Sequence, residues 1–164
     1  MKMPNDPGVQ KILLIVEDQL LLAMGLKDEL EICGYRVLEL AVHNKEAIGY
    51  ALEVKPDLAL VNIQLAGGDD GVALAADLRA LGVPVLFISG QAERARSAMA
   101  VGVGSIPKPY TPSELVASVD YLFRHAIGDE SRPPPSRLEV FDAVSPSYAQ
   151  DDGRLAPGLD NHLA

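Results

Sequence analysis

The sequence is poor in cysteine, in aromatic residues and in basic residues. A single cysteine, Cys33, in 164 residues supplies neither an internal disulfide nor a paired-cysteine metal site, so nothing requires an oxidising compartment. Only 14 bases face 23 acids, and the formal charge of −9 lacks the electrostatic footprint of direct nucleic-acid binding. No apolar run is long enough to cross a membrane, and the N-terminus lacks the apolar core of a signal peptide. We therefore expect a cytoplasmic protein whose partners are proteins or small ions.

Short apolar runs alternate along the chain with segments of helical period. Each run is too short for a helix and too apolar for a half-exposed strand, which indicates strands buried on both faces. The runs cover residues 11–16, 36–41, 58–62, 85–89 and 104–107. The intervening apolar residues recur every three or four positions, as in a helix that buries one face. Five such repeats predict an α/β fold: a (βα)₅ open, doubly wound parallel sheet of the flavodoxin-like type, covered by helices on both sides.

Local signals indicate where several helices begin and end. Thr111, Pro112 and Glu114 combine a capping residue, a proline at the first helical position and a glutamate that closes a capping box. Helix ends are expected at Gly34 and Gly82, and N-caps at Asn44 and Asp70.

Composition divides the chain into three parts. Residues 1–10 are polar with two prolines and read as a flexible lead-in, and residues 11–124 form the ordered domain. Residues 125–164 are acidic and rich in proline, which predicts a tail that is mostly disordered or loosely docked. Leu138, Val140, Phe141 and Val144 are apolar residues that would dock if any part does, but composition favours a solvated tail.

Polar residues follow four of the predicted strands. Ligands of open α/β sheets bind outside the carboxyl ends of the strands, where this chain places two acids, an amide, a hydroxyl and an ammonium: Glu17, Asp18, Asn62, Ser89 and Lys108. Carboxylates are ligands for Mg²⁺, while lysine and serine suit phosphate oxygens. Each residue alone is more often a loop or capping residue. Together they favour a site that handles a phosphoryl group.

The motifs LLIVED, PDLALVNIQLAGGDDG, LFISG and PKPY occur in this order. They make residues 11–124 similar to the receiver domain of two-component response regulators. The resemblance implies a CheY-like fold with strand order 2-1-3-4-5. It also implies a non-enzymatic signalling role, with a histidine kinase or phosphotransfer protein as partner and a homodimer as a further option. Because the tail is too acidic and proline-rich for a DNA-binding module, we expect a single-domain regulator that signals by protein contact.

The resemblance also implies a Mg²⁺ site at the end of the third strand. In the family an aspartate there accepts the phosphoryl group, and the metal is held by that aspartate, an acid after the first strand and a main-chain carbonyl. The matching positions here are Asp18, with Glu17 acting through water, Asn62 and the main-chain carbonyl of Gln64.

Three further positions correspond to the family's phosphoryl contacts and switch. Ser89 matches the hydroxyl residue that follows the phosphoryl group, and Lys108 matches the lysine that pairs with it, in a Lys108-Pro109 peptide expected to be cis. Ser105 stands where the family often has a Tyr or Phe that reports phosphorylation. Tyr110 is a weak candidate to replace that aromatic, and a partner contact or a packing residue is the simpler interpretation.

Asn62 departs from the family pattern, because an amide is not the carboxylate nucleophile that phosphoryl transfer needs. Two interpretations remain open: a substitution that disables an ordinary receiver and weakens its Mg²⁺ site, or a natural pseudo-receiver that acts as a constitutive interaction scaffold. Asp69 and Asp70 are poor substitute acceptors, since Asp70 is needed as a cap. Phosphatases of the haloacid dehalogenase type and flavodoxin-like cofactor binders are disfavoured, because the residues after the first strand, EDQLLLAM, suit neither.

Overall fold

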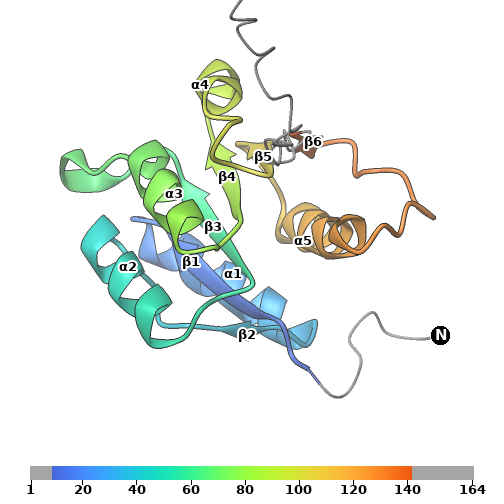
Figure 1. Cartoon of the computed structure of the whole chain (residues 1–164), viewed down its shortest axis with the longest axis horizontal. Coiled ribbons are helices and arrows are strands. Elements are labelled where there is room, and N and C mark those ends of the chain that lie inside the picture. The colour runs from blue at the N-terminus through green and yellow to red at the C-terminus, as the bar shows by residue number, and fades with distance from the viewer. Residues whose placement is uncertain (1–8, 142–164) are drawn as a thin grey trace, which may run out of the picture.

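The computed structural model describes residues 9–141, which form alternating strands and helices around one sheet (Figure 1). In chain order the elements are β1 (Ile12–Val16), α1 (Leu20–Ile32), β2 (Arg36–Val37), α2 (Asn44–Glu53), β3 (Leu58–Asn62), the 3₁₀ helix η1 (Ala66–Gly68), α3 (Gly71–Ala80), β4 (Val85–Ser89), α4 (Ala92–Ser97), β5 (Gly104–Pro107), α5 (Pro112–Ala126) and β6 (Glu139–Val140). None of the helices in this range is long and apolar enough to span a bilayer.

The sheet has the order β2-β1-β3-β4-β5-β6, and its first five strands are parallel. The predicted α/β fold and the order 2-1-3-4-5 are therefore confirmed. The second strand is shorter than predicted, because pairing stops at Val37 and returns only as a single bridge between Val16 and Ala41. Glu39, in the interrupted stretch, is an exposed charged residue in an otherwise apolar run.

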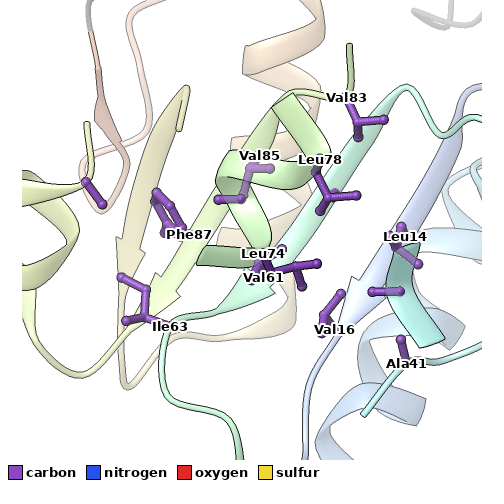
Figure 2. Packing of buried hydrophobic residues seen from close by; sticks show 14 of the residues in the cluster. Leu14, Val16, Ala41, Val61, Ile63, Leu74, Leu78, Val83, Val85 and Phe87 are labelled. Carbon is purple, nitrogen blue, oxygen red and sulfur yellow. The ribbon is translucent and has the colours of Figure 1, made fainter. Parts of the chain in front are cut away.

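Two apolar layers enclose the sheet. On one face α2, α3 and α4 pack against β1, β3 and β4, as Figure 2 shows around Val61, Val85 and Phe87. On the other face α1 and α5 cover the alternate residues of the same strands, with Leu26 and Val119 fully buried. Because the central strands are buried on both faces, their carboxyl ends hold a fixed frame for the polar loops.

Most of the predicted helix boundaries hold. The Thr111 hydroxyl accepts a hydrogen bond from the Glu114 main-chain nitrogen at 3.2 Å, and the Thr111 main-chain nitrogen donates to the Glu114 carboxylate at 2.8 Å. The predicted capping box is therefore confirmed. Asp70 caps α3 by accepting from the Val72 nitrogen at 3.0 Å. Gly34 and Gly82 end their helices at positive φ, 93° and 77°, a conformation that favours glycine.

The predicted N-cap at Asn44 is wrong, because His43 occupies that position and Asn44 is the first residue of α2. Glu46 accepts a hydrogen bond from the His43 main-chain nitrogen at 3.1 Å, which closes the start of the helix. The Asn44 side chain is used elsewhere: its amide nitrogen donates to the main-chain oxygen of Asp70 at 3.1 Å. Asn44 thus ties α2 to the loop before α3 rather than capping its own helix.

The segment after α5 contains an ordered contact that composition did not predict. Residues 137–141, called the C-terminal strap below, include β6, which pairs antiparallel with β5 at the edge of the sheet (Figure 1). Leu138 and Phe141 are only 7% and 4% exposed, so for these residues the docked alternative holds and the favoured expectation of a solvated tail does not. Successive side chains of an extended strand point to opposite faces of the sheet, so Leu138 faces the α1–α5 layer while Phe141 faces the α2–α4 layer. Both apolar layers therefore hold the strap in place. The predictions for residues 1–8 and 142–164, including Val144, lie outside the described residues.

Candidate functional site

Because the strands are parallel, the loops after β1, β3 and β5 all lie at the carboxyl ends of the strands. There the side chains of Glu17, Asp18, Asn62 and Lys108 converge, as predicted from their positions after the strands. Glu17 is 1% exposed and Asn62 4%, so the centre of the site lies beneath the surface. The Lys108 Nζ lies 3.7 Å from Glu17 Oε2. We call these four residues the acid pocket.

The Asn62 amide connects the two acids. Its Nδ2 donates to Glu17 Oε1 at 3.2 Å and to Asp18 Oδ1 at 3.3 Å, while its Oδ1 accepts from the Gln64 main-chain nitrogen at 3.2 Å. Both N–H groups and the carbonyl of this buried amide are therefore satisfied. A carboxylate in the same place would present oxygens to Glu17 and Asp18, so this network requires the amide.

Burial and mutual hydrogen bonding shift the pKa values of Glu17 and Asp18 in opposite directions. Burial raises the pKa of Glu17 above its usual value, and hydrogen bonding with Asp18 adds to the rise. Hydrogen bonding with Glu17 holds the pKa of Asp18 below its usual value. The pair therefore shares its negative charge unevenly, with Asp18 as the residue that carries it most readily.

The acid pocket contains an atom that lacks a hydrogen bond. Glu17 Oε2 is buried and has no hydrogen-bond partner among the described residues, although the Lys108 ammonium is near. A buried carboxylate oxygen in this condition suits a cation, and Mg²⁺ typically takes only one or two protein carboxylates. The carboxylates of Glu17 and Asp18 thus fit a hard divalent ion, and the Gln64 main chain is held beside Asn62 through its nitrogen. No cluster of three or more His, Cys, Asp or Glu side chains with metal-binding geometry occurs within residues 9–141.

Ser89 and Ser105 lie on the two strands that border the acid pocket, and the Ser89 main-chain oxygen accepts from the Lys108 nitrogen at 2.9 Å. Ser89, at the end of β4, accepts from the Gln91 nitrogen at 2.8 Å and donates to the Gln91 oxygen at 3.0 Å, so its hydroxyl bonds within its own loop. Ser105 is buried in β5. Both residues line one cavity of about 360 Å³, which extends from the end of β4 to the C-terminal strap. The hydroxyl of Ser89 is therefore held by Gln91, and its hydrogen bonds do not include Asn62.

Tyr110 packs against the α1–α5 layer and is half-buried. Its hydroxyl is buried and has no hydrogen-bond partner among the described residues. Burial raises the pKa of Tyr110 to about 12, and the negative charge of Glu17 contributes. This environment agrees with the interpretation of Tyr110 as a packing residue.

The two acids weighed as substitute acceptors have other roles. Asp70, besides capping α3, pairs with Arg94 at 2.9 Å. Asp69 accepts from the Asn44 main-chain nitrogen at 3.1 Å and lies 3.2 Å from His43 Nδ1. Both carboxylates are thus engaged away from the acid pocket.

Sequence reasoning missed Arg137. Its guanidinium donates to the main-chain oxygens of Pro107 and Pro109, on either side of Lys108. The peptide between Lys108 and Pro109 is cis, as expected. The signal for this contact was present in the alternating sequence RLEVF, but the surrounding prolines and acids obscured it.

Comparison with known proteins identifies the family. A family model described as the response regulator receiver domain matches residues 13–120. The transcriptional regulatory protein BaeR of Escherichia coli is 31% identical over 158 residues, which cover 94% of this chain and 62% of BaeR. The phyllosphere-induced regulator PhyR of Methylorubrum extorquens is 36% identical over 110 residues, covering 65% of this chain and 41% of PhyR. The chain therefore spans about half the length of these curated relatives.

Solved structures show the same relationship. The signal receiver domain of a modulated diguanylate cyclase from Desulfovibrio desulfuricans is 35% identical with a TM-score of 0.65, covering 74% of this chain and 100% of that domain. The response regulator PhyR of Brucella abortus is 28% identical with a TM-score of 0.62, covering 76% of this chain and 53% of that protein. With its parallel sheet, its acid pocket and the matched residues 13–120, this chain belongs to the response regulator receiver domain family.

Proposed function

We propose that this chain is a regulator that signals through protein contacts and whose acid pocket does not accept a phosphoryl group at position 62. The observation that carries the proposal is the Asn62 amide, which donates to both Glu17 and Asp18. The amide nitrogen shares its lone pair with the carbonyl, and both of its hydrogens are held by carboxylates, so it is not a nucleophile. The same two bonds hold the pocket in a single arrangement without a phosphoryl group.

The residues in and around the acid pocket keep the types that phosphoryl chemistry uses. Lys108 would pair with a phosphoryl oxygen, and Ser89 would donate a hydrogen bond to another after releasing Gln91. Glu17, Asp18 and the Gln64 carbonyl would hold Mg²⁺, which supplies positive charge against phosphoryl oxygens when bound. Asn62 weakens this site, because it removes one formal negative charge and occupies both carboxylates with its N–H groups.

The partner class follows from the family and from the charge. A histidine kinase or phosphotransfer protein is the proposed partner, because receiver domains interact with proteins of these kinds. Self-association into a homodimer is a second proposed contact. The formal charge of −9 favours protein partners over direct nucleic-acid binding, and the proposed compartment is the cytoplasm.

A constitutive scaffold without any phosphorylation is the second candidate function. The satisfied amide of Asn62 favours it, because every polar group of that side chain has a partner without metal or phosphate. In this candidate the Asn62 network is the working state of the protein. In the first candidate the network is the result of a lost acceptor.

Intact-mass detection of phosphorylation distinguishes these candidates. The full chain and its Asn62→Asp variant are incubated with a small-molecule phosphodonor and Mg²⁺. We expect only the variant to gain a phosphoryl group that hydroxylamine removes, which would identify a disabled receiver. Phosphorylation of neither protein would favour the scaffold, and phosphorylation of both would refute the assignment of position 62. Titration with Mg²⁺ and beryllofluoride provides a second readout of the same pocket.

A further inference from the structure

The β5 edge of the sheet is covered by only a short strand of the chain itself. An uncovered edge strand presents unpaired N–H and C=O groups that accept another strand. Here β6 pairs through two residue positions, Gly104 with Val140 and Ser105 with Glu139, and the Phe141 nitrogen extends the ladder to the Val103 oxygen at 3.0 Å. A Cβ at Gly104 would lie 2.7 Å from the Glu139 main-chain oxygen. The absence of a side chain at Gly104 therefore permits this close approach.

The side chains of the C-terminal strap match this edge at alternate positions. Leu138 and Phe141 enter the apolar layers on opposite faces of the sheet. Glu139 pairs with Arg96 of α4 at 3.0 Å, and Arg137 contacts the main chain after β5. The surface thus selects an extended segment with the order basic, apolar, acidic, apolar, aromatic.

Three observations indicate that the strap can leave its position on the β5 edge. Its ladder is short, and its ion pair is 60% exposed at Arg96 and 40% exposed at Glu139. The connection from α5 to the strap, residues 127–136, is largely exposed and includes three consecutive prolines that have no N–H to donate. The cavity of about 360 Å³ between α4 and the strap shows that the seat is incompletely filled.

We propose that the β5 edge, together with Arg96, is an acceptor site for an extended segment of a partner protein, and that the C-terminal strap is its displaceable intramolecular ligand. The partner segment carries the same chemistry as the strap, with an acidic side chain opposite Arg96 and apolar side chains on both sides of it. This site is separate from the acid pocket, and the proposal holds whether or not position 62 is ever phosphorylated.

The linker between α5 and the strap determines how strongly the strap competes with a free peptide for the β5 edge. A linker of about ten residues, stiffened by its three prolines, gives the strap an effective concentration on the order of millimolar at its own site. A free segment of equal intrinsic affinity therefore binds weakly to the intact chain and far more strongly once the strap is displaced. This difference makes the proposal measurable.

The test uses a labelled peptide with the sequence of residues 135–141, PSRLEVF, and the full-length chain. In the displaced variant, Leu138→Ser with Phe141→Ser, the strap no longer fills the edge. We expect the peptide to bind this variant at least tenfold more tightly than it binds the unsubstituted chain. Circular dichroism and slow hydrogen exchange in β1 and β3 check that the variant remains folded. If it does not, Glu139→Arg, which leaves the apolar residues in place, serves as the displaced variant.

Two further substitutions identify the peptide's seat. Gly104→Ala, added to the displaced variant, is expected to weaken peptide binding at least tenfold, whereas the matched control Gly49→Ala, in open space on α2, leaves it unchanged. Arg96→Glu is expected to weaken binding, and a peptide with Glu139→Arg restores it. Equal affinity for the unsubstituted and displaced proteins, or binding that Gly104→Ala does not alter, would overturn the proposal.

Discussion

Replacing Asn62 by aspartate should turn attraction into repulsion at the centre of the acid pocket. The amide now donates two hydrogen bonds to carboxylates. Asn62→Asp removes both donors and places a third carboxyl group where the nearest acid oxygens are 3.2 Å and 3.3 Å from the present amide nitrogen. We expect the substituted protein to fold less stably in the absence of Mg²⁺ and to become strongly dependent on that ion.

The size of the effect follows from the contacts that are lost. A hydrogen bond to a charged group contributes roughly 1.5–3 kcal/mol, and like charges about 4 Å apart repel by about 4 kcal/mol at an effective dielectric constant near 20. Protonation of one carboxyl and attraction by Lys108 limit the total, because the protein takes the least costly charge state. We therefore expect a loss of about 3 kcal/mol in the free energy of unfolding near pH 8. Mg²⁺ at one hundred times its dissociation constant should restore about 2.7 kcal/mol.

Urea denaturation in chelator and in Mg²⁺ measures these quantities for both proteins. Gln10→Glu is the matched control, because it adds one negative charge at an exposed amide remote from the pocket and should change stability little in either condition. The unsubstituted chain should gain much less from Mg²⁺ than the Asn62→Asp protein.

Two results would refute this reasoning. If Asn62→Asp is as stable as the unsubstituted chain in chelator, the amide is not what holds the two acids together. If Mg²⁺ stabilises both proteins equally, position 62 does not contribute to the metal site. A change confined to the slope of the denaturation curve would instead report a change in the unfolded state.

Other predictions test the frame around the pocket. Thr111→Ala removes an N-cap of α5 and should cost about 1 kcal/mol by urea denaturation. Gly71→Ala should destabilise by about 3 kcal/mol, because the new Cβ would lie 2.3 Å from the Asn62 main-chain oxygen, whereas Gly49→Ala should stabilise by about 0.5 kcal/mol or more. In a spectrophotometric titration, Tyr110 should ionise near pH 12, and Tyr110→Phe should remove that step. Because the raised pKa keeps the folded phenol protonated, stability should fall as the pH rises from about 10 through 12.

The fold was predictable because local and long-range signals agree. Continuous apolar runs are found where the central strands are buried on both faces, and Gly34 and Gly82 end helices as expected. The C-terminal strap was not predictable from composition, since five alternating residues are outweighed by the prolines and acids around them. Their docking depends on a long-range partner, the edge of β5, which composition does not reveal.

The acid pocket shows a similar division. The positions of Glu17, Asp18, Asn62 and Lys108 followed from the topology of a parallel sheet. Their hydrogen bonds did not, because the partners to which the Asn62 amide donates depend on side-chain positions to within a fraction of an ångström. The hydrogen bonds of the Ser89 hydroxyl to Gln91 were also unpredictable, since they arise from the local turn after β4.

The Arg137 guanidinium holds the main chain on both sides of Lys108. A ligand whose binding shifts the main chain at residues 107–109 would therefore also strain or break these two hydrogen bonds. Such a ligand would lower the affinity of the strap for the β5 edge, and release of the strap would then change the affinity for that ligand by the same factor. The acid pocket and the strap, which share no side chain, thus meet at three consecutive residues of the backbone.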